Sequence, residues 1–395
     1  MTVTSTPLAL RRARLGVNLM FLTNGAIFAN ILPRYPMVKD QLGVDAATFG
    51  LLVACFPAGA MIAGLAAARV IRRFSSAHTA VFGTYIVAAA LLLAAFAIDV
   101  SPWLFAAAMF LGGSADAIVD IGQNAHGMRV QRGYGRSIIN SFHAAWSAGA
   151  VIGGLMGSGA TALELPLTWH LVISGIVFSL AVAVAGRLAL PGPDTLDDDE
   201  EHRAKTSRAP LGRVALILAA LSVVALSGTF VEDAGSTWSA LFMRDIAGAA
   251  PSIAGLAYVS MVGAQFIGRL TGDSFVDRFG ARTVAYAGAV MIGAGFLTML
   301  LAPSQITTIG AFALAGFGCA TLVPAAFDAA DRIPGLPVGT GLTIIGWLMR
   351  LAFLAGPPVV GLITDHFGLR VGLSIVPIGA VALIVAARVL PTKVR

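Results

Sequence analysis

The sequence predicts an all-α membrane protein in which twelve transmembrane helices form two pseudo-symmetric six-helix bundles. Three observations predict this fold: an apolar composition, twelve long apolar runs, and a residue pattern that recurs about 205 positions along the chain. Of the 395 residues, 57% are apolar and 12% are charged, whereas about 25% are charged in soluble domains. This composition excludes a soluble enzyme, a nucleic-acid-binding protein and a disordered regulator.

The net charge of +6 does not indicate a nucleic-acid partner, because the basic residues stand singly between apolar runs and form no basic stripe. The two cysteines, Cys55 and Cys319, lie inside apolar runs, which argues against a disulfide framework or a metal site. The chain has no phosphate-binding loop of the Walker type and no nucleophile–base pair. We therefore expect neither an enzyme nor a bound cofactor. We expect the proton gradient to supply the energy for the protein's activity.

The apolar runs are long enough to cross the membrane, since a spanning helix needs about 20 such residues. The first run follows Arg11, Arg12 and Arg14, but it is too long for a cleaved signal peptide. The twelve expected spans are 15–38, 47–71, 77–99, 102–128, 137–161, 167–190, 214–242, 252–274, 281–302, 305–328, 340–364 and 369–390.

The distribution of Lys and Arg predicts the orientation of these spans. If the N-terminus is cytoplasmic and Arg350 is counted with the loop before its span, 22 of the 26 basic residues are assigned to cytoplasmic segments. Cytoplasmic loops carry such an excess, so we expect both termini on the cytoplasmic side of a bacterial inner membrane.

The stretch 191–210 contains the acidic run 197–201 and reads as a flexible, solvated linker. It separates two predicted bundles, 1–190 and 211–395. Equivalent pairs recur at an offset of 205: Gly50-Leu51 with Gly255-Leu256, and Arg73-Phe74 with Arg278-Phe279. This recurrence indicates a duplicated six-helix unit, as in transporters whose two halves rock around a central site.

The loop after the eighth span reads Gly272-Asp-Ser-Phe-Val-Asp277-Arg278-Phe-Gly280-Ala-Arg282. It resembles the signature loop of the major facilitator superfamily, Gly-x-x-x-Asp-Arg-x-Gly-x-Arg, with one extra residue. The resemblance extends over essentially the whole chain. It implies an inner-side charge latch with Asp277 and Arg278 as gating candidates, a tight turn at Gly280, and Arg282 as the closing residue of the motif.

A narrower resemblance is to the fucose-permease-like branch of that superfamily, carried by Asp120-Ile-Gly-Gln-Asn124 and by Asn140-Ser141-Phe142. It implies that Asp120 carries the coupled proton and that Asn124 contacts a sugar. The branch's acidic residue in the first span is missing here. Bacterial inner-membrane relatives of unassigned substrate show a similar overall pattern.

Charged residues inside the bilayer are costly and usually functional. Asp116, Asp120 and Asn124 follow one another at intervals of four, so they share one helix face. Two carboxylates one turn apart in a medium of low dielectric cannot both ionise cheaply. We therefore expect Asp116 and Asp120 to take part in proton coupling, although hydrogen-bonded structural roles are the alternative.

Other polar residues within the spans leave alternatives open. His143 either relays protons or is a structural histidine, and Trp146 either stacks on a sugar or fills space. Of the adjacent pair Glu232 and Asp233, at most one faces a cavity; it either binds a proton or closes an outer gate. Arg350 needs an anion, supplied either by Asp328, Glu232 or Asp233, or by the substrate.

The remaining substrate-binding candidates are Asn24, Asn30 and Gln265, whose polar side chains lie inside apolar runs. Small residues let helices approach closely, so we expect the glycines of the fifth and eleventh spans to form sliding contacts between the halves.

The sequence thus predicts a secondary transporter that works by alternating access, with proton-coupled symport of a small polar solute, a sugar or sugar-like acid. The resemblance to the superfamily implies a monomer. A proton-driven exporter of metabolites or drugs is the alternative within transport. An exporter of lipophilic drugs should have an aromatic-rich site, and only 8% of the residues are aromatic. The alternative from another class is a non-transporting membrane receptor on the same scaffold, which predicts no solute flux.

Overall fold

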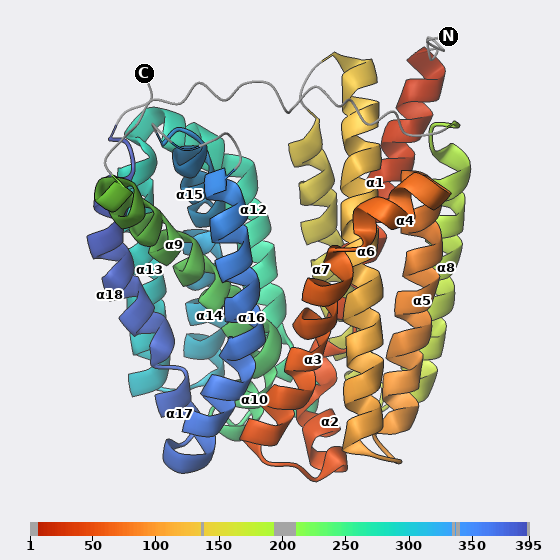
Figure 1. The fold of residues 1–395 in the computed structure, drawn as a ribbon. Coiled ribbons are helices and arrows are strands. Elements are labelled where there is room, and N and C mark those ends of the chain that lie inside the picture. Colours follow the sequence, from red (N-terminus) through yellow and green to blue (C-terminus); the bar gives the residue numbers. More distant parts are fainter. Residues whose placement is uncertain (1–6, 136–137, 193–210, 334–335, 337–339, 393–395) are drawn as a thin grey trace. The chain divides into compact units, whose positions relative to one another are not determined.

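The computed structural model describes residues 7–135, 138–192, 211–333, 336 and 340–392. Within these ranges every regular element is a helix or a helical turn, and none is a strand. Figure 1 shows the helices in their chain order. The predicted linker 191–210 lies almost wholly outside the described residues, so the predicted bundle boundaries remain a prediction.

The part of the chain before the linker forms eight helices and one 3₁₀ turn. They are α1 (Pro7–Ala29), η1 (Leu32–Arg34), α2 (Tyr35–Leu42), α3 (Ala46–Gly64), α4 (Ala67–Phe74), α5 (Ser76–Ala97), α6 (Pro102–Tyr134), α7 (Ile139–Ala162) and α8 (Leu167–Leu188).

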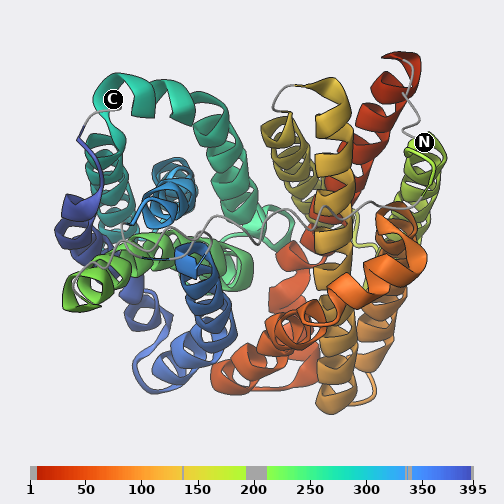
Figure 2. The same cartoon turned by 45° about the horizontal axis from the view of Figure 1, so that its top comes forward.

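The part after the linker repeats this pattern with more interruptions. Its elements are α9 (Leu211–Asp233), the π-helical turn η3 (Ala234–Trp238), α10 (Ser239–Asp245), α11 (Pro251–Ala254), α12 (Leu256–Phe279), α13 (Ala281–Leu301), α14 (Gln305–Cys319), α15 (Leu322–Asp331), α16 (Thr340–Phe367), α17 (Leu369–Gly372), α18 (Ile375–Ala386) and η4 (Ala387–Val389). Figure 2 shows α12 turning directly into α13.

Eleven helical segments of the described chain are long and apolar enough to cross a membrane. The predicted fifth span, α7, falls outside these eleven because its many glycines and its serine, histidine and tryptophan side chains lower its hydropathy. Its 24 residues nevertheless measure about 36 Å at 1.5 Å per residue, enough to span a hydrocarbon core of ~30 Å. The eleven apolar segments and α7 together make the twelve predicted spans.

The described residues form two compact units. The described residues of the first unit lie within Met1–Val44, Leu51–Thr195 and Ala250–Val259, and those of the second within Asp45–Gly50, Leu196–Ala249 and Ser260–Arg395. Each unit includes one short segment from the other half of the sequence, and specific contacts explain both assignments. In the second unit, Asp365 of α16 accepts hydrogen bonds from the backbone N–H groups of Ala46 (2.9 Å) and Ala47 (2.7 Å) at the start of α3. In the first unit, Gly255 packs against Pro33 and Ser158.

The backbone repeats the duplication that the sequence predicts. Gly43 (φ 62°) and Gly248 (φ 65°), 205 residues apart, both lie in the left-handed region within three residues after a helix. Ser75 (φ 69°) and Gly280 (φ 82°), at the same offset, both precede a helix with positive φ. Glycine adopts this conformation without steric cost, whereas Ser75 does not. The tight turn predicted at Gly280 is therefore present.

A row of glycines on α7 brings this helix against α1 inside the first unit. A Cβ atom added to Gly149 would overlap the carbonyl oxygen of Leu22; at Gly153 and Gly157 it would overlap those of Ala26 and Asn30. The prediction that these three glycines form sliding contacts between the halves is therefore wrong. Their spacing of four matches the spacing of the α1 carbonyls, so they serve packing within one unit.

Candidate functional site

A hydrogen-bonded network in the first unit joins α1, α6 and α7 around Asn24, which is 7% exposed. The Asn24 side-chain amide donates to Asp116 Oδ1 (2.7 Å), while its Oδ1 accepts from Trp146 Nε1 (3.0 Å) and Gln123 Nε2 (3.3 Å). Because the Asn24 oxygen is occupied by two donors, the amide nitrogen is held toward Asp116. The close α1–α7 approach sets this geometry, since Gly25 lies against the Trp146 carbonyl.

The network continues along α6 to Asp120. Its Oδ1 accepts from Asn124 Nδ2 (3.0 Å) and from Gln123 Nε2 (3.3 Å). The Asp120 side chain is exposed, whereas Gln123 is fully buried and Asp116 is half-buried. The predicted Asp116–Asp120–Asn124 face therefore exists, and Gln123 and Asn24 link its two carboxylates.

Gln123 leaves one hydrogen-bonding position open. Its Oε1 is buried and has no hydrogen-bond partner among the described residues. Both carboxylates accept hydrogen bonds from amide N–H groups, so the network holds acceptors in excess of donors. A carboxyl group that binds a proton becomes a donor, and the unpartnered Gln123 oxygen is an acceptor beside it.

Two other predicted residues of the first unit, His143 and Asn30, contact groups outside this network. His143 is exposed, and its ring meets the Phe21 ring edge-on at 5.3 Å. Asn30 is fully buried; its Oδ1 faces His170 Nε2 at 2.8 Å and its amide donates to the Ala26 carbonyl. Because both ends of the Asn30 amide are engaged, this geometry favours a structural role over the predicted contact with substrate.

The second unit holds its own polar cluster, where α9 gives way to the π-helical turn η3. Glu232 Oε1 pairs with Arg269 Nη2 of α12 at 3.3 Å and accepts from Gln265 Nε2 at 2.5 Å. Asp233, the next residue, is 3% exposed; it accepts from Thr237 (3.4 Å) and packs against Gly356. These adjacent acids contact different neighbours, and which of them faces a cavity stays a prediction. π-Helical turns occur frequently at functional sites.

Arg350 of α16 is exposed and makes no ion pair with any described residue. The three acids proposed as its partners are engaged elsewhere: Glu232 with Arg269, Asp233 with Thr237, and Asp328 with Arg332.

The helical period places Arg350 on the same face of α16 as two residues that pack on α3. Arg350 precedes Pro357 by seven residues and Gly361 by eleven, so the three share one face. Further along α16, this face packs on the start of α3, where Gly50 meets the Pro357 carbonyl and Gly361 meets Ala46. The exposed apolar side chains of α16, such as Leu351 and Leu362, lie roughly 100° around the helix from Arg350.

Asp277 and Arg278, the predicted latch residues, make no ion pair with another described residue. Asp277 and Arg278 are exposed, and the Arg278 guanidinium lies over the neighbouring Phe279 ring. Arg282 donates through Nε to the Leu390 carbonyl (2.9 Å), so it ties the start of α13 to the end of the chain in the second unit. The gating roles stay predictions.

The sequence matches a family model described as the Major Facilitator Superfamily twice, over residues 17–270 and over residues 224–395. An uncharacterised transporter of Sinorhizobium fredii is 30% identical over 95% of this chain and 97% of its own length. The chain belongs to the major facilitator superfamily. An uncharacterised transporter of this type from Yersinia pestis is 27% identical, over 95% of each chain.

Solved structures of major facilitator transporters share this fold. A bacterial homologue of the human lysosomal transporter Spinster superposes with a TM-score of 0.73 at 14% identity, covering 98% of both chains. The D-xylose-proton symporter gives 0.71 at 15% identity, covering 98% of this chain and 99% of the other. FucP in its outward conformation gives 0.59 at 19% identity, covering 95% and 97%. The protein is thus a multi-pass membrane transporter with the twelve-helix fold.

Sequence reasoning missed two residues that organise these clusters. Gln123 follows Asp120 by three positions, an interval that also places two side chains on one helix face. Arg269 lies within the predicted eighth span, one turn after Gln265. A charged residue inside a span is usually functional, so this position could have marked Arg269 as a candidate. Its partner could not be found from sequence, because Glu232 lies 37 residues away.

Removing one member of the Glu232–Arg269 pair is expected to destabilise the protein. Both side chains are about 70% covered, so Arg269→Gln leaves the Glu232 carboxylate without its cation and should cost about 2 kcal/mol of unfolding free energy. The double variant Glu232→Gln/Arg269→Gln should recover most of this loss. A double-mutant cycle of unfolding in detergent measures the coupling.

The matched control is the exposed pair Asp328–Arg332, whose charged atoms are 2.5 Å apart. Asp328→Asn should leave stability unchanged, because exposed pairs contribute little. Equal effects at the two pairs would contradict the assigned role of Glu232 and Arg269.

Proposed function

We propose that this protein is a proton-coupled symporter that carries a small polar solute with an anionic group, such as a sugar-like acid, by alternating access. The observation that carries the proposal is the network that links Asp116 and Asp120 through Gln123 and Asn24. It combines a pair of carboxylates on a membrane-spanning helix with amides that orient both of them.

The arrangement suits a proton carrier. Asp120 is exposed and can exchange protons with water, whereas Asp116 is half-buried and bound to Asn24. The carboxylates lie one helical turn apart, so a charge on one disfavours a charge on the other. A proton held in this network neutralises one carboxylate and supplies the donor that the buried Gln123 oxygen lacks.

Arg350 supports an anionic group on the solute. Arg350 is exposed and makes no ion pair with any described acid. A guanidinium binds carboxylate or phosphate through two parallel hydrogen bonds. Among proteins of the same fold are a D-xylose-proton symporter and the fucose:proton symporter FucP, and their names agree with proton-driven uptake of a sugar-like compound.

Proteoliposomes that enclose a pH-sensitive dye test this proposal. Adding a solute outside drives it inward, whichever way the protein is inserted. Symport then carries protons inward and acidifies the lumen. A proton-driven exporter is an antiporter, so it moves protons outward as the solute enters and makes the lumen alkaline. A panel of sugars, sugar acids and carboxylates is expected to contain an anionic member that acidifies the lumen. Protein-free liposomes control for direct permeation of the acid.

Asp120→Asn is expected to abolish the solute-driven proton flux. The asparagine oxygen can still accept from Asn124 and Gln123, so the fold is retained, but it cannot carry a proton at this position. Exchange of labelled solute for unlabelled solute should persist, because exchange needs no net proton transfer. Asp99→Asn, in the exposed turn after α5, is the matched control and should behave as the wild type.

Three outcomes would overturn the proposal. Alkalinisation by every active solute would assign proton-driven export. Proton flux retained in both Asp120→Asn and Asp116→Asn would remove the α6 network from coupling. Folded protein that moves none of the solutes, and binds one of them without flux, would favour a receptor.

A further inference from the structure

A pocket of about 240 Å³ lies between the beginning of α1 and the end of α8, inside the first unit. Two arginines, Arg12 and Arg187, line it together with apolar side chains that include Leu8 and Leu190. The positive-inside count places this end of the unit on the cytoplasmic side of the membrane. The pocket thus joins two cations to an apolar wall at the predicted level of the lipid headgroups.

Close helix packing brings the two arginines together. A Cβ atom at Gly16 would stand 2.8 Å from the Ala185 carbonyl oxygen and 3.1 Å from Leu188 Cβ, so only glycine permits this approach. Arg12 lies one turn before Gly16. Beyond α8, Arg129 of α6 donates to the carbonyls of Pro191 (2.5 Å) and Gly192 (3.0 Å), which holds the chain that forms the pocket wall.

Both arginines are available to an anion. Arg12 and Arg187 are exposed, and neither makes an ion pair or a hydrogen bond with a side chain in the described ranges. Two guanidinium groups that share one pocket repel each other, and a bound anion relieves this repulsion. Basic pockets between membrane helices on the cytoplasmic side bind anionic lipid headgroups.

An apolar surface leads away from the arginines along α8. Ile173, Ile176, Leu180 and Val184 are exposed, and their spacing places them on the helix face that ends at Arg187. On α1, Arg12 stands between the exposed Leu8 and Leu15, at intervals of four and three. A guanidinium bordered by apolar side chains in this way matches a phospholipid, whose charged head adjoins its hydrocarbon chains.

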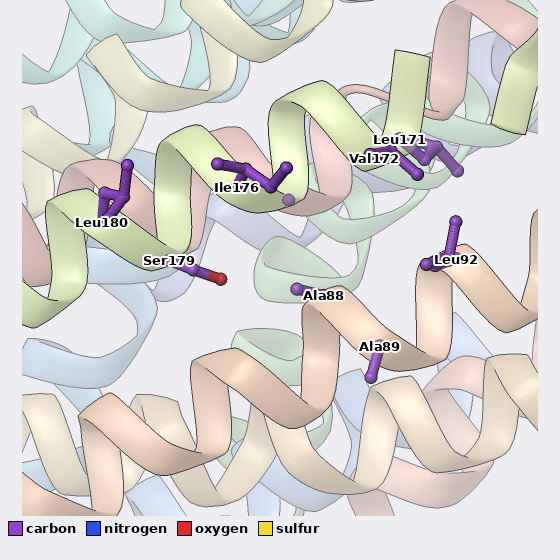
Figure 3. Close-up of a pocket in the computed structure, with 9 residues that line it drawn as sticks. Ala88, Ala89, Leu92, Leu171, Val172, Ile176, Ser179 and Leu180 are labelled. Carbon is purple, nitrogen blue, oxygen red and sulfur yellow. The ribbon is translucent and has the colours of Figure 1, made fainter. Parts of the chain in front are cut away.

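A second hollow, of about 280 Å³, continues this surface between α5 and α8. Figure 3 shows Ile176 and Leu180 on α8, with Ala88, Ala89 and Leu92 on the facing helix. Alanines on α5 and Gly175 on α8 leave the space open. Leu180 precedes Arg187 by seven residues, or about 10 Å along the helix, so a lipid with its phosphate at the arginines has its acyl chain within reach of this hollow.

We propose that the first unit binds one anionic phospholipid, with its phosphate between Arg12 and Arg187 and an acyl chain along α8 in the hollow beside α5. A free phosphate ion satisfies the arginines but makes no use of the apolar surface. The continuity of charged pocket, apolar stripe and hollow therefore favours the lipid. This inference does not depend on the solute or on proton coupling.

Native mass spectrometry and thermal unfolding of the whole protein in detergent test this site. Dioleoyl phosphatidylglycerol should bind and raise the midpoint of unfolding, whereas dioleoyl phosphatidylcholine and inorganic phosphate should not. Arg12→Gln/Arg187→Gln should weaken phosphatidylglycerol binding about 30-fold, since each basic residue near an anionic lipid contributes about 1 kcal/mol. Lysine at both positions should retain most of the binding. Arg388→Gln, an exposed arginine of the second unit, is the matched control.

A separate variant tests the hollow between α5 and α8. Ala88→Phe fills the space beside Gly175 and should weaken binding of long-chain phosphatidylglycerol more than binding of a short-chain form. Equal stabilisation by inorganic phosphate would reassign the pocket to a free anion. Phosphatidylglycerol binding that is unchanged in the double arginine variant, or reduced equally by Arg388→Gln, would overturn the proposal.

Discussion

Replacing Gly149 with alanine is expected to cost about 3 kcal/mol of unfolding free energy, near the upper end of the usual penalty for overpacking. The added methyl group would overlap the carbonyl oxygen of Leu22 on α1. A helix carbonyl cannot rotate away as a flexible side chain can, so α1 and α7 must separate. The same separation stretches the Trp146–Asn24 hydrogen bond, and solute-driven proton flux should fall with stability.

Gly159 on the same helix is the matched control, because a Cβ atom there meets nothing within 4 Å. Gly159→Ala should be neutral or stabilising by up to about 1 kcal/mol, the helix-propensity difference between glycine and alanine. Denaturant titration of both variants in one detergent measures the contrast. Equal stability of the two variants would show that α1 and α7 are not in backbone contact at Gly149.

Replacing Arg350 with glutamine is expected to weaken the binding of an anionic solute about 100-fold, because truncating one partner of a hydrogen-bonded charge pair costs several kcal/mol. The binding of a neutral analogue of the same solute should change little. This contrast follows from the exposed, unpaired guanidinium of Arg350. Transport competition by both compounds, in wild type and variant, measures the two affinities.

Arg350→Lys should recover part of the affinity, since lysine keeps the charge but cannot form two parallel hydrogen bonds to a carboxylate. If Arg350→Gln lowered the affinity for the anionic and the neutral compound equally, Arg350 would have a structural role. Flux of the neutral compound then distinguishes an inactive protein from one that has lost only anion recognition.

The Asp116–Asp120–Asn124 face could be predicted because it depends on the helical period alone. Three polar residues at intervals of four share a face of any α-helix, and their place in an apolar run shows that they are unusual there. The residues that complete the network could not be predicted in the same way. Asn24 lies 92 residues from Asp116, and only the packing of α1 on α6 and α7 decides that these side chains meet.

Arg350 shows the limit of reasoning from depth in a span. Its position predicted the need for an anion, and three acids were available on neighbouring spans. The structure pairs Glu232 with Arg269 instead, because α9 and α12 bring these side chains together. The residue of α16 that meets Asp233 is Gly356, not Arg350. Pairing between helices depends on their rotation about their own axes, which the period within a single span does not specify.

The sequence by itself determined the all-helical membrane fold, the twelve spans, the duplication and the face of α6 that carries two carboxylates, because hydropathy and periodicity are local properties. The tertiary structure alone decided which polar groups meet, and that Gly149, Gly153 and Gly157 of α7 pack against α1 within one unit. The physical reason is that hydrogen bonds and close contacts act over a few ångströms. Residues distant in sequence reach that range only after the helices have packed.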